Sequence, residues 1–290
     1  MCSSDLVQRG YALLVEPDPK TRLQALGLKG LSRGDAFAQL ARHCLEHVLI
    51  EGEALTQFRQ PEAIHQMRVA LRRLRALISL FAPVIKGAEV SAIRSALKEL
   101  ARALAPARDL DVLIGTLARL ESIPSPLITS LTKARSTAYD LACFKVSDIS
   151  FSQAILAFLA LVEVGAWRTA TGGQGKKRDR AIEPFARKTL NHLRRTLKHK
   201  GRDLIGLSTT QRHKLRIQAK KLRYALNMFA SLYEPHTAAH QSYLKSIKAL
   251  QDQLGASNDR AVGMGLLAAH GQELSEADHN TLAARLWSDS

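Results

Sequence analysis

The sequence predicts an all-α protein made of two related halves. Almost every long segment carries apolar residues at helical spacing, and no run of strand length alternates with a period of two. An internal repeat, described below, indicates the two halves. The 290 residues are 46% hydrophobic, which is enough for a sizeable core and argues against a disordered chain.

The first helices are predicted from their capping and proline signals. Asp35 is the candidate cap of a helix that runs to about residue 57. Pro61 fits the first turn of a second helix, which ends near Pro83. A third helix is expected at about 89–104, and Asp109 is the candidate cap of a fourth.

Two further helices are expected at roughly 126–144 and 151–168. The longest apolar run, residues 154–167, is interrupted by Glu163 and is shorter than the roughly 20 residues that a bilayer crossing needs, so we expect a buried helix there. A glycine-rich stretch then predicts a flexible linker at 172–179.

The strongest organisational signal is that the pattern begins again after this linker. Residues 65–75 read HQMRVALRRLR, and HKLRIQAKKLR returns at 213–223 with an offset of 148. The same offset places Phe37 on Phe185 and Phe81 on Phe229, whereas Leu104 matches Leu254, and Asp109 matches Asp259, at an offset of 150. A duplicated four-helix unit explains these matches.

This repeat predicts a domain organisation. Residues 1–33 form an N-terminal extension, 34–171 the first helical bundle, 172–179 the linker and 180–288 the second bundle. The two bundles are expected to be pseudo-symmetric, and the stretch 122–170 belongs to the first copy only.

The charge of the chain is concentrated in one region. Lys and Arg number 42 against 26 Asp and Glu, a net charge of +16. Between residues 176 and 223, 17 basic residues face three acids, which is a net +14 and leaves only +2 for the rest. Such a concentration indicates a polyanion as the partner.

On a helix, the repeated motif places its basic residues along one line. His65, Arg68, Arg72 and Arg75 fall within an arc of about 80°, opposite an apolar arc. The copy places His213, Arg216, Lys220 and Arg223 in the same way. A solvated helix face is the ordinary alternative, but such a face mixes signs to gain ion pairs, and neither stripe contains an acid. The stripes therefore predict anion binding.

A third stripe occurs in the second half alone. It consists of Arg187, Arg194, Lys198 and Arg202, on the helix before the second motif. The first-half counterparts are Gln39, Glu46, Ile50 and Ala54. We therefore expect the binding surface to be stronger in the C-terminal half.

These motifs, together with RDLDV at 108–112, resemble the CHAD domain, the conserved histidine α-helical domain, over about residues 34–288. The resemblance implies two helical bundles around a basic central channel or cleft that binds inorganic polyphosphate without catalysis, cofactor or metal. It also implies association with polyphosphate granules. Its implied ligands are the two stripes of His65, Arg68, Arg72, Arg75, His213, Arg216, Lys220 and Arg223. A cytoplasmic location, with no membrane association, is expected from the residues themselves, because the three cysteines are far apart and the N-terminus lacks the regions of a signal peptide.

Other residues have less certain roles. Arg73 and Lys221 lie beside the two stripes as candidate contacts. Asp109 and Asp259 are candidate helix caps that orient an arginine. The second copy departs from the first at Asn258, where the first has Arg108, so the turn around it is not symmetric. Both motif histidines also fit a structural role at the start of a helix.

Residues 8–14, QRGYALL, resemble the end of a CYTH triphosphatase domain, which often precedes CHAD in one chain. No ExExK signature of such a domain occurs in the sequence. The N-terminal extension is therefore interpreted as the tail of a truncated CYTH domain.

Two other functions compete with polyphosphate binding. The basic stripes also fit a nucleic-acid backbone, although aromatic residues are only 5% and base stacking would have little to use. An HxxEH pattern at His43, Glu46 and His47 matches an inverted zinc-peptidase motif, but a five-residue match in a chain with ten histidines arises easily by accident.

Overall fold

The computed structural model describes residue 23 and residues 25–120, 122–202, 206–233, 238–272, 281–282 and 284–286. It is all-α, as predicted: over these residues the β structure is limited to one isolated bridge. The resemblance of residues 8–14 to a CYTH domain falls outside the described residues.

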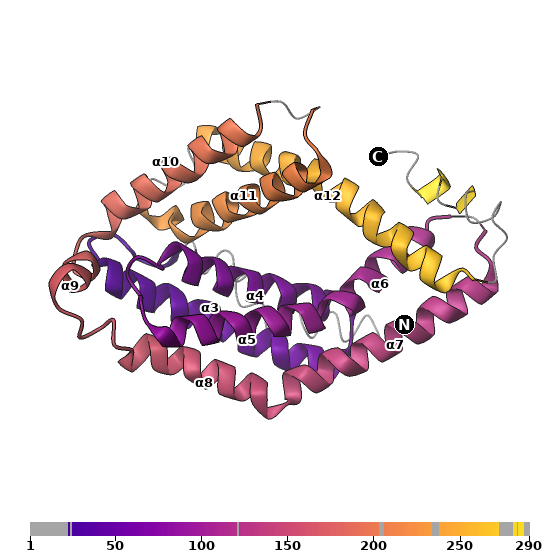
Figure 1. Ribbon diagram of the computed structural model, residues 1–290, viewed down its shortest axis with the longest axis horizontal. Helices are drawn as coiled ribbons and strands as arrows, with labels where there is room; N and C mark the ends of the chain where they lie inside the picture. The colour runs from indigo at the N-terminus through magenta and orange to yellow at the C-terminus, as the bar shows by residue number, and fades with distance from the viewer. Residues whose placement is uncertain are drawn as a thin grey trace, which may run out of the picture.

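The first half contains six helices in chain order, which follow the predicted sequence of elements (Figure 1). They are α3 (Arg33–Phe58), α4 (Pro61–Leu80), α5 (Ala88–Ala103), α6 (Ala105–Leu117), α7 (Ser125–Ser147) and α8 (Ile149–Val164). α4 packs against α3 on one side and α5 on the other, and α8 lies across α3 and α5. These four helices therefore enclose the core of the first half.

Two predicted helix starts are wrong. α3 begins two residues before Asp35, because the hydroxyl of Ser32 accepts a hydrogen bond from the Asp35 backbone N–H and so forms the cap. α6 begins at Ala105, with Pro106 in its first turn, so Asp109 lies inside the helix and does not cap it. Asp259 likewise lies inside a helix.

The apolar run at 154–167 is only half buried, contrary to the prediction. Phe158 and Leu161 of α8 are buried, whereas Leu156 is 61% and Val164 79% exposed. The reason is position, because α8 covers the outside of the bundle (Figure 1). No single described helix is long and apolar enough to cross a membrane, although α7 and α8 together, bent by 48°, pass by length and composition.

The segment 172–179, predicted as a flexible linker, contains the short helix α9 (Gly172–Arg178). Arg178 anchors it, because the guanidinium donates hydrogen bonds to the backbone carbonyls of Trp167, Arg168 and Ala170. Side-chain anchoring of this kind overrides the flexibility that the glycines would otherwise give.

The second half has one long helix where the first has two. It consists of α10 (Ile182–Lys200), α11 (Thr209–Met228), the 3-10 turn Ala230–Leu232 and α12 (Ala238–His270). α12 repeats both α5 and α6 without a break. In the first half, Pro106 ends α5 because its ring would clash with the carbonyl four residues earlier, whereas the matching residue in α12 is Ala256.

The two halves meet through residues that match in the repeat. The rings of Phe81 and Phe229 lie 6.1 Å apart, and those of Phe81 and Phe37 lie 5.5 Å apart. Phe185 contacts both Phe81 and Phe229, at 5.1 and 6.2 Å. The bridge between Ser32 and Ala181 adds a backbone contact. The four rings are two matched pairs of the repeat, and their contacts join the two halves.

Candidate functional site

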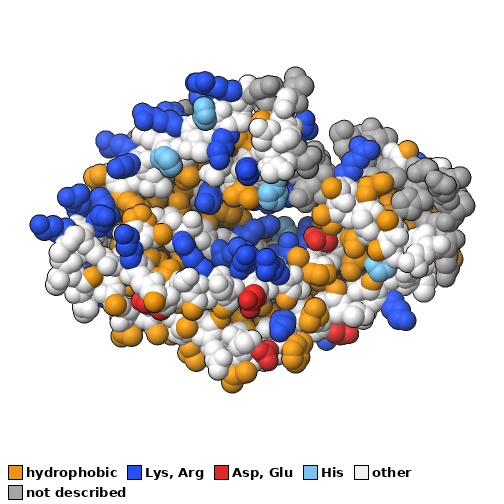
Figure 2. All heavy atoms as spheres, in the orientation of Figure 1, with side chains coloured by type: hydrophobic (Ala, Val, Ile, Leu, Met, Phe, Trp, Pro, Cys, Tyr) orange, Lys and Arg blue, Asp and Glu red, His pale blue; other side chains and the backbone are white. Residues whose placement is uncertain are grey.

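A groove lined by cations runs between the two halves, where α4 and α11 lie side by side (Figure 1). We call it the central groove. It has a volume of about 530 Å³, and Figure 2 shows Lys and Arg side chains gathered in the hollow at the middle of the face. Its lining residues are Arg72, Arg75, Ala76, Ser79, Ser91, Arg94, Ser95, Lys98, Ile217, Lys220, Lys221 and Tyr224.

The two basic stripes approach each other at matched positions. Arg72 of α4 and Lys220 of α11 are repeat counterparts, and both line the central groove. Burial together with the charges of Arg216, Arg72 and Arg223 lowers the pKa of Lys220 to about 8, although Asp259 opposes this shift. The folded structure thus holds like charges close together, which is typical of an anion-binding site.

The N-terminal part of the α4 stripe lies against α5 and near Arg108 of α6. Arg68 donates a hydrogen bond of 3.3 Å to the carbonyl of Ala101 at the end of α5. Burial is the main cause that lowers the pKa of His65, and Arg108, Arg72 and Arg68 add to the effect. His65 is therefore a neutral imidazole near pH 7, and it would donate a hydrogen bond to phosphate without carrying a charge.

Two guanidinium donors in the stripes have no acceptor. The Nε atoms of Arg72 and Arg216 are buried and make no hydrogen bond within the described structure. A buried donor without an acceptor costs free energy, so such atoms call for an explanation. Of the two residues, Arg72 lines the central groove.

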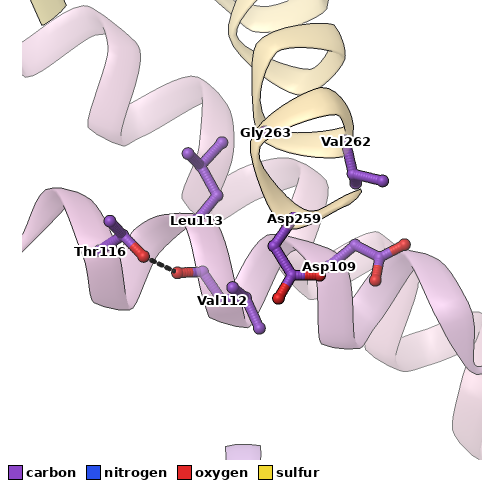
Figure 3. Close-up of a pocket in the computed structure, with 7 residues that line it drawn as sticks. All are labelled: Asp109, Val112, Leu113, Thr116, Asp259, Val262 and Gly263. Carbon is purple, nitrogen blue, oxygen red and sulfur yellow. Dashed lines mark hydrogen bonds between the residues drawn. The ribbon is translucent and has the colours of Figure 1, made fainter. Parts of the chain in front are cut away.

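Asp109 and Asp259, also repeat counterparts, lie beside the stripes at a small pocket of about 50 Å³ between α6 and α12 (Figure 3). Arg216 Nη2 lies 3.8 Å from Asp259 Oδ1. Burial raises the pKa of Asp109 and the charge of Asp259 adds to this, whereas Arg68 opposes it. The two carboxylates thus lie where they can attract the guanidinium groups of Arg68 and Arg216, although neither carboxylate caps a helix.

Several predicted residues lie elsewhere. Arg73 points toward α3, where its Nη1 lies 3.4 Å from His47 Nδ1, and it does not line the central groove. His213 is exposed at the first turns of α11. Lys221, by contrast, does line the central groove.

The third stripe lies in a separate groove. Arg194 and Lys198 of α10, and Arg202 just beyond its end, line a cavity of about 730 Å³ together with residues of α12, and none of them lines the central groove. Arg187, the fourth residue of the stripe, lines neither groove. The structure therefore divides the predicted cations between two places.

α5 contributes cations to the central groove that the sequence motifs did not predict. Arg94 and Lys98 line the central groove, and Arg94 also donates a hydrogen bond of 3.2 Å to the carbonyl of Ile78 in α4. Arg102 lies close enough to Arg75 to lower its pKa, after burial. The signal was present, because residues 94, 98 and 102 are spaced by four and share one helix face.

The HxxEH pattern does not form a metal site. His47 is buried, with its Nε2 3.2 Å from Glu51 Oε1, and Arg73 lies at its other nitrogen. Across the residues that the structure describes, no group of three or more His, Cys, Asp and Glu side chains could hold a metal ion.

Fold and groove together define an all-α module with a positively charged surface between two related halves. The family model described as CHAD domain matches residues 39–268. The chain therefore belongs to the CHAD domain family, as the sequence motifs predicted.

Solved structures agree with this assignment. The crystal structure of the CHAD domain from the plant Ricinus communis is 27% identical, covers 91% of this chain and 89% of its own, and has a TM-score of 0.77. PptA from Streptomyces chartreusis, 18% identical with a TM-score of 0.59, covers 89% of this chain and 93% of its own and shares the fold. No curated protein matches the sequence.

Proposed function

We propose that the protein binds inorganic polyphosphate in the central groove, between the α4 and α11 stripes. Membership of the CHAD family, whose known role is polyphosphate binding, supports this in general terms. The observation that carries the finer proposal is the pair of facing stripes, which bring Arg72 and Arg75 of α4 and Lys220 and Lys221 of α11 to one groove. Arg binds phosphate oxygens in a bidentate fork, and each cation replaces condensed counterions of the polyanion.

The composition of the groove favours polyphosphate over nucleic acid. Proteins that bind single strands stack bases on exposed aromatic rings. Tyr224 is the one aromatic residue that lines the central groove, and it is only 6% exposed. The cations can thus bind a phosphate chain, but the lining of the groove has no exposed aromatic ring on which a base could stack.

The test replaces three cations of the α11 stripe, Arg216, Lys220 and Arg223, with Ala. We expect long-chain polyphosphate to bind about 100-fold more weakly, because a charged contact is worth at least about 1 kcal/mol and 1.4 kcal/mol is tenfold in affinity. The dependence of affinity on salt should also become flatter, since fewer counterions are released. Helicity should not change. Titration calorimetry at several salt concentrations and circular dichroism measure these quantities.

A matched control loses the same charge elsewhere. Lys86, Arg119 and Lys133 are exposed and line neither groove, so their replacement by Ala should leave affinity within about twofold of the parent. Equal affinity in the α11 variant and the parent would refute the proposal. Displacement of polyphosphate by single-stranded or duplex nucleic acid at equal charge concentration would favour the nucleic-acid alternative instead.

Further parts of the proposal rest on the family alone. We propose that the module is not catalytic, since CHAD is a binding domain, and that it associates with polyphosphate granules in the cytoplasm. Release of orthophosphate on prolonged incubation would contradict the first point, and loss of granule localisation in the α11 variant would support the second. Polyphosphate contact by Arg187, Arg194, Lys198 and Arg202 stays a prediction of the sequence alone and is not part of the central-groove proposal, since none of these residues lines that groove.

A further inference from the structure

The groove lined by the third stripe has features that a polyphosphate site does not require. We call it the outer groove. It lies between α10 and the first half of α12, and it is lined by Arg194, Arg195, Leu197, Lys198, Gly201, Arg202, Tyr243, Ile247 and Leu250. Leu197 and Ile247 are buried and Leu250 is partly buried, so its floor is apolar. One wall carries four exposed cations, three on α10 and the fourth, Arg202, just beyond its end.

The repeat shows what occupies the matching place in the first half. α10 repeats α3, and the first half of α12 repeats α5. In the first half, the helix α8 packs across α3 and α5, and its Phe158 and Leu161 are buried. The counterparts of Ile247 and Leu250 are Leu97 and Leu100 of α5, which are 0% and 8% exposed. The outer groove is therefore the position that a helix fills in the other half.

Charge indicates the kind of helix that would fit. α8 is tied to α3 by an ion pair in which Arg42 Nε and Nη2 donate to the two carboxylate oxygens of Glu163, at 2.6 and 2.7 Å. In the outer groove, none of the four lining cations has an acidic partner among the described residues. A helix placed there would need carboxylates along the edge that faces α10.

We propose that the outer groove binds an amphipathic helix of a partner protein, with an apolar face toward Ile247 and Leu250 and acidic residues toward Arg194, Lys198 and Arg202. The helix-in-groove mode needs an apolar floor, and charge complementarity adds specificity and speeds association. Polyphosphate would contact the cations but would make no use of the apolar floor. The partner site and the central groove lie on different helices of the second half, so both ligands can bind at once.

The test uses a synthetic 16-residue helical peptide as the probe. It carries Leu at the positions of Ile155, Phe158 and Val162 in α8, and Glu along one flank. We expect it to bind the full chain at micromolar concentration in fluorescence anisotropy, and binding should fall at least tenfold when its Glu residues are replaced by Lys. Replacement of Arg194, Lys198 and Arg202 by Ala should also weaken binding at least tenfold, while the exposed residues Lys188, Lys200 and Lys248, replaced by Ala as a control, should change it less than twofold.

Three outcomes would overturn the proposal. The first is equal binding of the acidic and basic peptides. The second is displacement of the acidic peptide by long-chain polyphosphate, which would make the outer groove a polyanion site. The third is a dimer of the chain alone in sedimentation that dissociates in the Arg194, Lys198 and Arg202 variant, since a second copy would then be the occupant. None of these depends on the central groove, whose polyphosphate affinity is measured with the α11 variant.

Discussion

At the scale of single residues, the central groove collects charges that repel one another. Lys220 lies near Arg216, Arg72 and Arg223, and this crowding together with burial holds its pKa at about 8, below its ordinary value. Crowded cations destabilise the folded protein, and a bound anion would relieve the repulsion. The repulsion between these cations in the free protein would therefore contribute to the affinity for an anion.

The lowered pKa of Lys220 predicts a pH dependence of binding. Below pH 8 the ammonium is charged in the free protein, and above pH 8 it progressively loses its proton. Polyphosphate stabilises the charged form, so affinity should be highest below pH 8 and fall about tenfold by pH 9.5, which is the loss of roughly one charged contact of about 1.5 kcal/mol. Titration calorimetry between pH 7 and 9.5 measures the fall.

Lys220→Arg is the matched control for this pH dependence. An arginine keeps its charge throughout this range, so the variant should bind with nearly constant affinity between pH 7 and 9.5. If the variant shows the same fall as the parent, some other group is responsible for it.

Asp109 gives a second prediction at this scale. Burial and the nearby Asp259 raise its pKa, so the ionised carboxylate destabilises the fold at pH values above the folded pKa. Asp109→Asn should therefore raise the unfolding temperature at pH 7, and the difference should shrink at pH 3, where the parent carboxyl is protonated in both states. Scanning calorimetry at the two pH values tests this, and a lower unfolding temperature at pH 7 would show that attraction to Arg68 dominates.

At the scale of elements, the sequence predicted the order and type of the helices well, because apolar spacing and proline positions report directly on them. Pro61 starts α4, as predicted. The errors arise where a single side-chain hydrogen bond determines the local structure. Ser32 and not Asp35 caps α3, and Arg178 anchors the segment that was expected to be a flexible linker. Such contacts depend on geometry that the sequence pattern does not contain.

The fusion of two helices into α12 follows from one position in the repeat. Ala256→Pro should break α12 as Pro106 breaks the first half, at a cost of about 3 kcal/mol and several degrees in unfolding temperature, because a helix-interior proline removes a hydrogen bond and clashes with the preceding turn. Pro106→Ala is the control and should change stability by less than about 1 kcal/mol, since a first-turn proline replaces an N–H that has no helical partner. Equal thermal unfolding of Ala256→Pro and the parent would contradict this explanation.

At the scale of the whole molecule, the repeat predicted two halves, and the structure adds how they meet. The stripes could be drawn on each helix from the sequence, but their facing arrangement across the central groove depends on the contacts of Phe81 with Phe185 and Phe229. For the same reason, the sequence could not predict that residues of the third stripe line a separate groove, the outer groove. The sequence pattern predicts which residues share a helix face. Which other helix lies opposite that face depends on how the core packs.

Because each half supplies one wall of the central groove, polyphosphate should hold the halves together and stabilise the whole fold. A ligand that binds only the folded state adds about 2.7 kcal/mol at 100 times its dissociation constant, so long-chain polyphosphate should raise the unfolding temperature of the parent by several degrees. Orthophosphate at the same phosphate concentration should not, since a single phosphate cannot span both walls. The double variant Arg72→Ala and Arg75→Ala, and the double variant Lys220→Ala and Lys221→Ala, should each lose most of the shift in scanning calorimetry. A full shift retained in either variant would show that one half binds polyphosphate alone, and the groove between the halves would then not be the site.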